Sequence, residues 1–326
     1  MNGFRAKKIY LGFALVFFVI AALTPLLGLW DRPSSPSSSG SAAPLPERTD
    51  DGERFRLRHA DTGKIETVSR QTYLFGVLAA EMGGGFEPEA LKAQAVAAYS
   101  FALYRAGERA EEAYDLTDDP SCDQAYLSRQ AAQKKWGDAF DSYAAAIDKA
   151  VKEVDGYCLV DEEGQPILAA YHAVSSGRTE SSLIAWGTEK SYLQPVESVG
   201  DLLSPDYLST RTFTDAELAE KLKPAVTLTG DALNWLGEVV CSPSGTVTAI
   251  TLGGTTLTGE QVRQLLGLRS AAFQVVREES GYTFQVKGYG HGVGMSQYGA
   301  NYMAKCGSTF VEILSHYYTG CKMVRG

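Results

Sequence analysis

Glu81 is the side chain of this sequence whose position best suits proton transfer. It stands at the end of an apolar stretch, residues 78–82, where the pattern predicts the last turn of a helix over residues 73–82. The negative end of the helix dipole and the apolar neighbours both disfavour an ionised carboxylate, so the pKa of Glu81 is predicted to be raised. Glu87 and Glu89 begin the next predicted helix, where the dipole favours a carboxylate. A solvated glutamate at a helix end is the alternative explanation of Glu81.

A glycine-rich segment, residues 288–300, could bring a ligand close to the main chain. Its glycines alternate with larger residues, and His291, Ser296 and Gln297 lead from it into a predicted helix. Alternating glycines leave the backbone accessible, and helix starts bind polar groups. A tight turn followed by a capped helix explains the same residues without a ligand.

A second polar segment, residues 171–180, follows a predicted strand. The segment and the residues after it carry polar and aromatic side chains of interest, namely His172, Ser175, Ser176, Trp186 and Tyr192. Aromatic faces can stack on sugar rings and hydroxyl groups can pair with sugar hydroxyls, so the combination suits a carbohydrate. An ordinary turn beside a buried tryptophan is the other explanation.

Composition and missing motifs exclude several other chemistries. The chain carries 30 Lys and Arg against 39 Asp and Glu, a net charge of -9, so it offers no basic field for a nucleic-acid backbone. The motifs of P-loop nucleotide sites, HExxH metalloproteases, nucleophile elbows and GxGxxG dinucleotide sites are missing. The five cysteines include no C-x-x-C pair, and the four histidines lie apart in the sequence. The spacing therefore indicates no metal or cofactor site.

The elements that would position these residues alternate between helix-like and strand-like patterns, which indicates an α+β fold. Residues 73–82 and 88–104 are predicted as two helices joined by three glycines, with Gly107 closing the second. Residues 128–154 are predicted as one long helix. Residues 157–160 and 167–172 are predicted to form a hairpin around a polar turn.

The second half of the chain carries three pairs with the spacing of a capping box, in which a threonine precedes a helix and Glu or Gln follows three residues later. The pairs are Thr214 with Glu217, Thr258 with Gln261, and Thr309 with Glu312. Strands are predicted over residues 246–252, 272–277 and 282–287. We therefore expect one mixed α+β domain over residues 54–326, either a single body or two lobes, with a substrate groove.

The N-terminus predicts a membrane anchor. Residues 9–30 are 22 residues without charge, long enough as a helix to cross a hydrocarbon core of about 30 Å. Basic residues precede this run, so residues 1–8 are predicted to stay in the cytoplasm and the rest to be exported, as in a single-pass type II membrane protein. Residues 31–53 are rich in Ser and Pro and predict a tether. A cleaved signal peptide, whose apolar core is usually about 7–15 residues, is the alternative.

Four segments in this order resemble the stage II sporulation protein D family. They are residues 74–82 (LFGVLAAEM), residues 89–98 (EALKAQAVAA), the loop after His172, and residues 290–297 (GHGVGMSQ). The resemblance covers residues 54–322, and the predicted anchor and tether match the layout of that family. The ending, residues 312–318 (EILSHYY), is similar to the family's last helix.

This resemblance implies a peptidoglycan lytic transglycosylase that cuts glycan strands between N-acetylmuramic acid and N-acetylglucosamine outside the membrane, during forespore engulfment. The family's catalytic Glu falls on Glu81. One carboxylic acid suffices for this chemistry: it protonates the glycosidic oxygen and then takes the proton of the muramyl 6-hydroxyl, which closes a 1,6-anhydro ring. Residues expected to contact substrate are Lys92, His172, Ser175, Ser176, Tyr192, His291, Ser296 and Gln297.

The resemblance also implies partners, namely peptidoglycan glycan strands and a membrane-associated engulfment complex that includes a peptidoglycan amidase or endopeptidase. The sequence departs from the family at Tyr99, where members commonly carry Arg. A zinc-binding subset has a His-x5-Cys-x5-Cys pattern, whose nearest match here is Glu111, Thr117 and Cys122, so only the last ligand is kept and no metal is expected.

Two other functions stay open at this point. One is a non-catalytic glycan-binding or amidase-enhancing module built on the same domain. The other is a different exported hydrolase, which would need a second carboxylate to act with the first.

Overall fold

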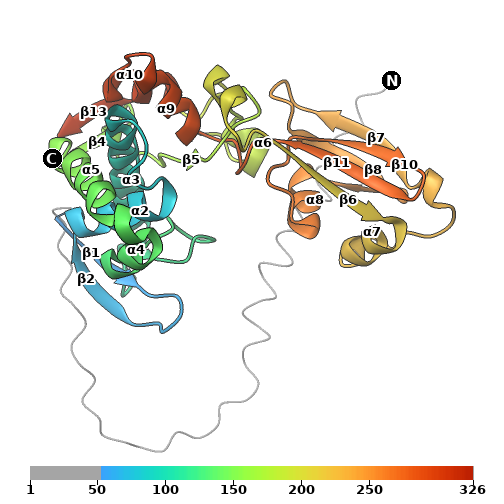
Figure 1. Ribbon diagram of the computed structural model, residues 1–326, viewed down its shortest axis with the longest axis horizontal. Helices are drawn as coiled ribbons and strands as arrows, with labels where there is room; N and C mark the ends of the chain where they lie inside the picture. Colours follow the sequence, from blue (N-terminus) through green and yellow to red (C-terminus); the bar gives the residue numbers. More distant parts are fainter. Residues whose placement is uncertain (1–52, 326) are drawn as a thin grey trace, which may run out of the picture. The chain divides into compact units, whose positions relative to one another are not determined.

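The computed structural model describes residues 53–325 of the chain (Figure 1). The predicted cytoplasmic tail and anchor, and all but the last residue of the predicted tether, lie outside the described residues. Among the helices of residues 53–325, none has both the length and the apolar character needed to cross a membrane. The described part combines helices with several small sheets, which confirms the predicted α+β class.

The helices are α2 (Arg70–Glu81), α3 (Pro88–Glu108), α4 (Arg129–Trp136), α5 (Phe140–Glu153), α6 (Ser182–Trp186), α7 (Asp215–Leu222), α8 (Gly259–Leu266), α9 (Gln297–Lys305) and α10 (Phe310–Tyr317). Short 3-10 turns are η1 (Gly137–Ala139), η2 (Val199–Leu203) and η3 (Ala232–Asn234).

The strands form five small sheets. In spatial order they are β2 (Ile65–Ser69), β1 (Arg54–Arg58) and β3 (Leu116–Thr117); β10 (Phe273–Glu278), β11 (Gly281–Lys287) and β6 (Leu208–Thr214); β7 (Leu236–Cys241), β8 (Val247–Leu252) and β9 (Thr255–Leu257); β12 (Met295–Ser296) and β5 (Tyr171–His172); and β13 (Lys322–Arg325) and β4 (Tyr157–Val160).

Helix α3 is the centre of the first of two hydrophobic cores. Pro88 occupies its first turn, where the missing N–H costs nothing, and alanines fill its buried positions. Small side chains let other elements pack closely on several sides of α3, and α2, α5, α9 and α10 all contact it (Figure 1). Helix α2 begins at Ser69, whose side chain accepts a hydrogen bond from the N–H of Thr72. The glutamate that ends α2 is therefore anchored by an apolar helix packed on α3.

The second core lies between the sheet of β6, β10 and β11, the strand β8, and the helices α7 and α8. All three predicted capping boxes are confirmed, at the first turns of α7, α8 and α10. The predicted strands correspond to β8, β10 and β11 within one residue at each end.

Three predictions about helices and strands were wrong in detail. The helix predicted over residues 128–154 is interrupted, because Gly137 adopts φ +53° as the cap of α4 and a 3-10 turn follows it. Helix α3 continues through Gly107 to Glu108. The predicted hairpin is shorter than expected: it consists of a bridge between Val160 and Pro166 with backbone hydrogen bonds from Asp161 to Gln165 and from Ile167 to Leu159.

Partners from the C-terminal part of the chain also pair with the two segments of the predicted hairpin. The last strand, β13, pairs antiparallel with β4, and β12 pairs parallel with β5. The second pairing sets Ser296 opposite His172. Gly294 precedes β12 with φ +71°, and a side chain there would overlap the carbonyl oxygen of Ala170. Glycine is required at this position for the two segments to meet.

Candidate active site

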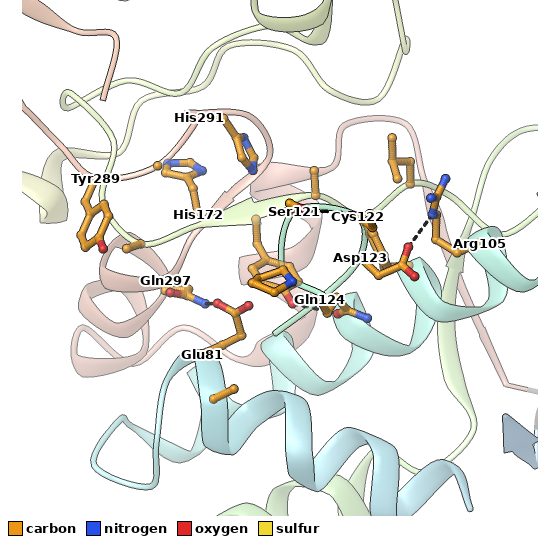
Figure 2. Close-up of a pocket in the computed structure, with 18 of the residues that line it drawn as sticks. Glu81, Arg105, Ser121, Cys122, Asp123, Gln124, His172, Tyr289, His291 and Gln297 are labelled. Carbon is orange, nitrogen blue, oxygen red and sulfur yellow. Dashed lines mark hydrogen bonds and ion pairs between the residues drawn. The ribbon is translucent and has the colours of Figure 1, made fainter. Parts of the chain in front are cut away.

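A cavity of about 710 Å³ collects residues from seven separate segments of the chain, among them Arg105 of α3 (Figure 2). Its lining includes Glu81 from α2, the segment of residues 120–124, the β5 segment with His172, Trp186 from α6, the segment of residues 289–291, and Gln297 from α9. Sequence analysis singled out Glu81, His172, His291 and Gln297 separately, and the structure places all four on this cavity.

Glu81 is a mostly buried carboxyl group with two long hydrogen bonds. The side chain of Gln297 donates to one carboxylate oxygen over 3.4 Å, and the backbone N–H of Ala125 donates to the other over 3.3 Å. Burial raises the pKa of Glu81 above its usual range, and these two donors and the charge of Lys135 oppose the rise. The carboxyl group can therefore hold a proton and, after losing it, is stabilised by two donors.

The other carboxylate on the cavity wall, Asp123, is already engaged. Its side chain is fully buried and receives hydrogen bonds from the guanidinium groups of Arg105 and Arg109 and from the backbone N–H of Thr117. A carboxylate that accepts hydrogen bonds from two arginines and a backbone N–H has little capacity left to activate water. Among the described residues that line the cavity, Glu81 is therefore the only carboxyl group poised for proton transfer.

His172 and His291 lie near one another on the cavity wall, with ring centroids 5.8 Å apart. The backbone of Val293 orients both rings. Its carbonyl accepts from Nδ1 of His172 over 3.1 Å, and its N–H donates to Nδ1 of His291 over 3.1 Å. Burial lowers the pKa of His172 to about 4 and that of His291 to about 3, so both rings are neutral near pH 7.

The hydrogen bond of His172 fixes its tautomer. Because Nδ1 donates to a carbonyl, Nε2 carries no proton and can only accept. This Nε2 atom is buried and has no hydrogen-bond partner in the described structure. A ligand that offers a hydroxyl or amide donor here would satisfy it.

Two partly exposed aromatic side chains stand on the same cavity. Trp186 is 42% exposed and Tyr289 46% exposed, and the Trp186 ring centroid lies 5.2 Å from that of His291. Flat, accessible rings beside buried polar groups are a common feature of sugar-binding sites.

Several residues expected to contact substrate lie away from the cavity. Lys92 forms ion pairs with Glu89 and Glu153, each at 2.7 Å. The Tyr192 hydroxyl accepts a hydrogen bond from the backbone of Leu168, and its ring is buried.

The three predicted serine contacts are held inside the protein instead. Ser175 and Ser296 are buried and both donate to Asp201. Ser176 donates to the carbonyl of Ser244. None of the three lines the cavity that holds Glu81.

The positions that depart from the family pattern are also placed. The Tyr99 hydroxyl accepts a hydrogen bond from Arg70 over 3.2 Å, and the residue is buried off the cavity. Cys122 lies on the cavity wall. Within residues 53–325, no three His, Cys, Asp or Glu side chains gather as a metal site requires.

Sequence reasoning missed Asp123, Gln124 and Asp201, which hold the cavity together. Gln124 accepts from the Tyr171 hydroxyl over 2.8 Å and donates to the Tyr73 hydroxyl over 3.0 Å. These residues belong to segments without periodicity or motif, so no local signal could have singled them out.

The fold and the site together define an α+β protein with a single raised-pKa carboxyl group on a partly aromatic cavity. The family model described as Stage II sporulation protein matches residues 58–160. Stage II sporulation protein D of Bacillus subtilis (strain 168) is 39% identical over 263 residues, which cover 79% of this chain and 75% of that protein. The corresponding protein of Bacillus amyloliquefaciens is 39% identical over 261 residues, 78% and 74% of the two chains. The chain therefore belongs to the stage II sporulation protein D family.

A more distant relative carries a different name. The amidase enhancer of Bacillus subtilis (strain 168) is 26% identical over 298 residues, which cover 76% of this chain and 39% of that protein.

Proposed function

We propose that this protein is a membrane-anchored lytic transglycosylase of sporulation that cleaves peptidoglycan glycan strands with Glu81 as its single acid and base. The observation that carries the proposal is the contrast between the two carboxyl groups of the cavity. Burial raises the pKa of Glu81, whereas Asp123 is held in ion pairs with Arg105 and Arg109. A glycoside hydrolase needs two available carboxylates, at about 5–5.5 Å or 6.5–9.5 Å depending on mechanism. A transglycosylase needs only one.

The proposed reaction uses the Glu81 carboxyl group twice, first as an acid and then as a base. Protonated Glu81 gives its proton to the glycosidic oxygen as the bond to C1 of N-acetylmuramic acid breaks. The resulting carboxylate takes the proton of the 6-hydroxyl of the same sugar while that oxygen bonds to C1, which closes the 1,6-anhydro ring and restores the acid. Gln297 and the N–H of Ala125 stabilise the carboxylate between the two steps.

The neighbouring side chains suit the binding of sugar rings. The unpartnered Nε2 of His172 can accept from a sugar hydroxyl or from an N-acetyl N–H. Neutral histidines avoid placing a positive charge beside the protonated Glu81, which would lower its pKa. Trp186 offers a ring face to a sugar.

The cellular setting of the proposal follows the family. Its relatives are named for stage II of sporulation, so we infer a role in sporulation at the forespore engulfment step. Residues 9–30 would hold the domain outside the cell membrane in a type II orientation, next to glycan strands and to an engulfment complex with a peptidoglycan amidase or endopeptidase.

The test is the variant Glu81→Gln in the full chain, assayed on peptide-stripped glycan strands. Gln keeps the size and can still form hydrogen bonds but cannot transfer a proton, so release of 1,6-anhydro ends should fall by about 10²–10⁴-fold or more. Glycan binding should persist. Glu87→Gln is the matched control, because Glu87 precedes α3 without a side-chain capping bond and does not line the cavity. Near wild-type release by Glu81→Gln would refute the assignment.

The match to an amidase enhancer favours a second candidate, a non-catalytic glycan-binding module. The same experiment separates the two. A wild-type chain that binds glycan strands and releases no anhydro ends supports the binding module, and reducing ends in place of anhydro ends support a hydrolase.

A further inference from the structure

Asp201 is a buried carboxylate that belongs to no part of the proposed reaction. It lies in η2, is 0% exposed, and does not line the cavity. One of its oxygens accepts from the backbone N–H of Ser175 over 2.9 Å and from the Ser175 hydroxyl over 2.5 Å. The other accepts from the Ser296 hydroxyl over 2.6 Å. Asp201 thus joins the segment of Ser175 to the segment of Ser296. The same two segments also meet where His172 is hydrogen-bonded to Val293, 121 residues further along the chain.

These two segments carry the cavity residues. Ser175 follows β5, which ends in His172, and Ser296 ends β12, which pairs with β5. The Ser296 hydroxyl also accepts from the backbone N–H of Gly299 over 3.1 Å, so it caps α9. Gln297, the donor to Glu81, is the first residue of α9.

The turn that holds Asp201 is itself fixed against α9. A side chain at Gly200 would overlap the ring of Tyr302, and one at Gly299 would overlap the hydroxyls of Ser198 and Tyr317. The Ser198 and Tyr317 hydroxyls are hydrogen-bonded to each other over 2.7 Å. This close backbone contact brings η2 against α9, so that Asp201 reaches the hydroxyl of Ser296 at the start of the helix.

We propose that Asp201 is a positioning residue, which holds the start of α9 so that Gln297 meets Glu81. The expected effect on catalysis rests on the proposed function. The expected effect on the hydrogen bond between Gln297 and Glu81 does not. Without Asp201, the buried N–H of Ser175 loses its acceptor and Ser296 loses its tie to η2. The first turn of α9 can then move away from Glu81.

The position acts through geometry rather than through charge. In Asp201→Asn the amide oxygen can still accept from Ser175, and the new NH₂ can donate to Ser296. The Ser296 hydroxyl can turn its proton to the carbonyl of Ala173, which lies 3.3 Å away. Asparagine should therefore preserve most of the arrangement, whereas Asp201→Ala removes it.

The experiment measures two properties of the full chain in mild detergent. The first is kcat and KM for release of anhydro ends as a function of pH. The second is the titration of the Glu81 carboxyl carbon by NMR in chains labelled at glutamate, assigned by its loss in Glu81→Gln. The variants are Asp201→Ala, Asp201→Asn, Gln297→Ala and the double variant Asp201→Ala with Gln297→Ala.

We expect Asp201→Ala to lower kcat by about 10- to 100-fold with a smaller change in KM, since displacement by about 1 Å is enough for such a loss. Gln297 lowers the pKa of Glu81, so losing its donation should raise that pKa and move the alkaline limb of activity to higher pH. Asp201→Asn should restore most of kcat. The double variant should shift the Glu81 titration no further than Gln297→Ala alone.

Other groups also face Glu81, namely Lys135 of α4, Tyr73 of α2 and Tyr171 of β5. The comparison with Gln297→Ala isolates the one contact in question. If Asp201→Ala does not fold, Ser296→Ala breaks the same tie from the other side. Its matched control is Thr214→Ala, which removes the capping hydroxyl of α7 in the second core.

Two results would overturn the inference. One is a folded Asp201→Ala, or a folded Ser296→Ala, with the wild-type Glu81 titration. The other is an Asp201→Asn as impaired as Asp201→Ala. A wild-type chain without transglycosylase activity would refute the proposed function alone, because the Glu81 titration still decides the role of Asp201.

Discussion

Replacing Trp186 with alanine should weaken glycan binding while leaving the proton-transfer step intact. Trp186 ends α6, whose first turn is capped by Ser181 and whose last turn closes at Gly187 in the left-handed region with φ +73°. This short, capped helix holds the indole ring on the cavity beside His291. The Trp186 ring forms no hydrogen bond with Glu81, so removing the ring should weaken glycan binding rather than proton transfer.

The size of the effect follows from the exposure of the ring. Trp186 is 42% exposed, so a sugar ring can still cover a substantial part of its face. Stacking contributes about 0.5–1.5 kcal/mol beyond the area it buries, and apolar contact adds about 25 cal/mol per Å². A total of about 1–2 kcal/mol corresponds to a Kd for glycan strands that is about 5- to 30-fold weaker.

The assay is binding of glycan strands to the full chain carrying Glu81→Gln, which prevents turnover, with and without Trp186→Ala. Trp186→Phe should retain part of the affinity. Leu183→Ala is the matched control, because Leu183 lies on the same helix, is 49% exposed and does not line the cavity. Equal affinity of the Trp186→Ala and Leu183→Ala chains would refute the reasoning.

Two further predictions concern the pH dependence of stability. Because burial raises the pKa of Glu81, ionising it opposes folding, so Glu81→Gln should be more stable than wild type at neutral pH. That advantage should shrink to nothing as pH falls below about 4.3, the pKa of a glutamate in the unfolded chain. Thermal melts of both chains between pH 4 and 8 test this. A stability difference that does not depend on pH would contradict it. Burial lowers the pKa of His172 from 6.5 to about 4, so protonating this ring should cost wild type about 3 kcal/mol of stability as pH falls through that window, in addition to the loss caused by His291, whose pKa burial lowers to about 3. His172→Asn, whose amide can still donate to the Val293 carbonyl, should escape the part of this loss that His172 causes. Urea unfolding at pH 7 and 4.5 tests this, and an equal loss of unfolding free energy in both chains would count against it.

Much of the local structure could be predicted from the sequence because its determinants lie within a few residues. The capping boxes at Thr214, Thr258 and Thr309 each depend on a pair three residues apart, and all three helices begin where predicted. The raised pKa of Glu81 was also predicted, from the apolar residues that precede it in its own helix, and burial in the folded protein raises that pKa. The family followed from segments that keep their order along the chain.

The arrangement of the site depended on contacts that no local pattern encodes. The parallel pairing of His172 with Ser296 joins segments more than a hundred residues apart. Asp123 and Asp201 look alike in the sequence, as single acidic residues in irregular segments. Asp123 is buried beside arginines and forms ion pairs with them, whereas Asp201 is buried among hydroxyl groups and binds Ser296 at the start of α9.

The same reason explains why predicted contacts such as Lys92 and Tyr192 lie elsewhere. Residue type indicates what a side chain can bind, and the sequence by itself determined the chemical groups available to this protein: a carboxylic acid at the end of an apolar helix, histidines and aromatic rings. Only the tertiary structure decided which of these groups share a cavity. That choice is made by the packing of distant segments, because burial and hydrogen-bond satisfaction are properties of the whole fold.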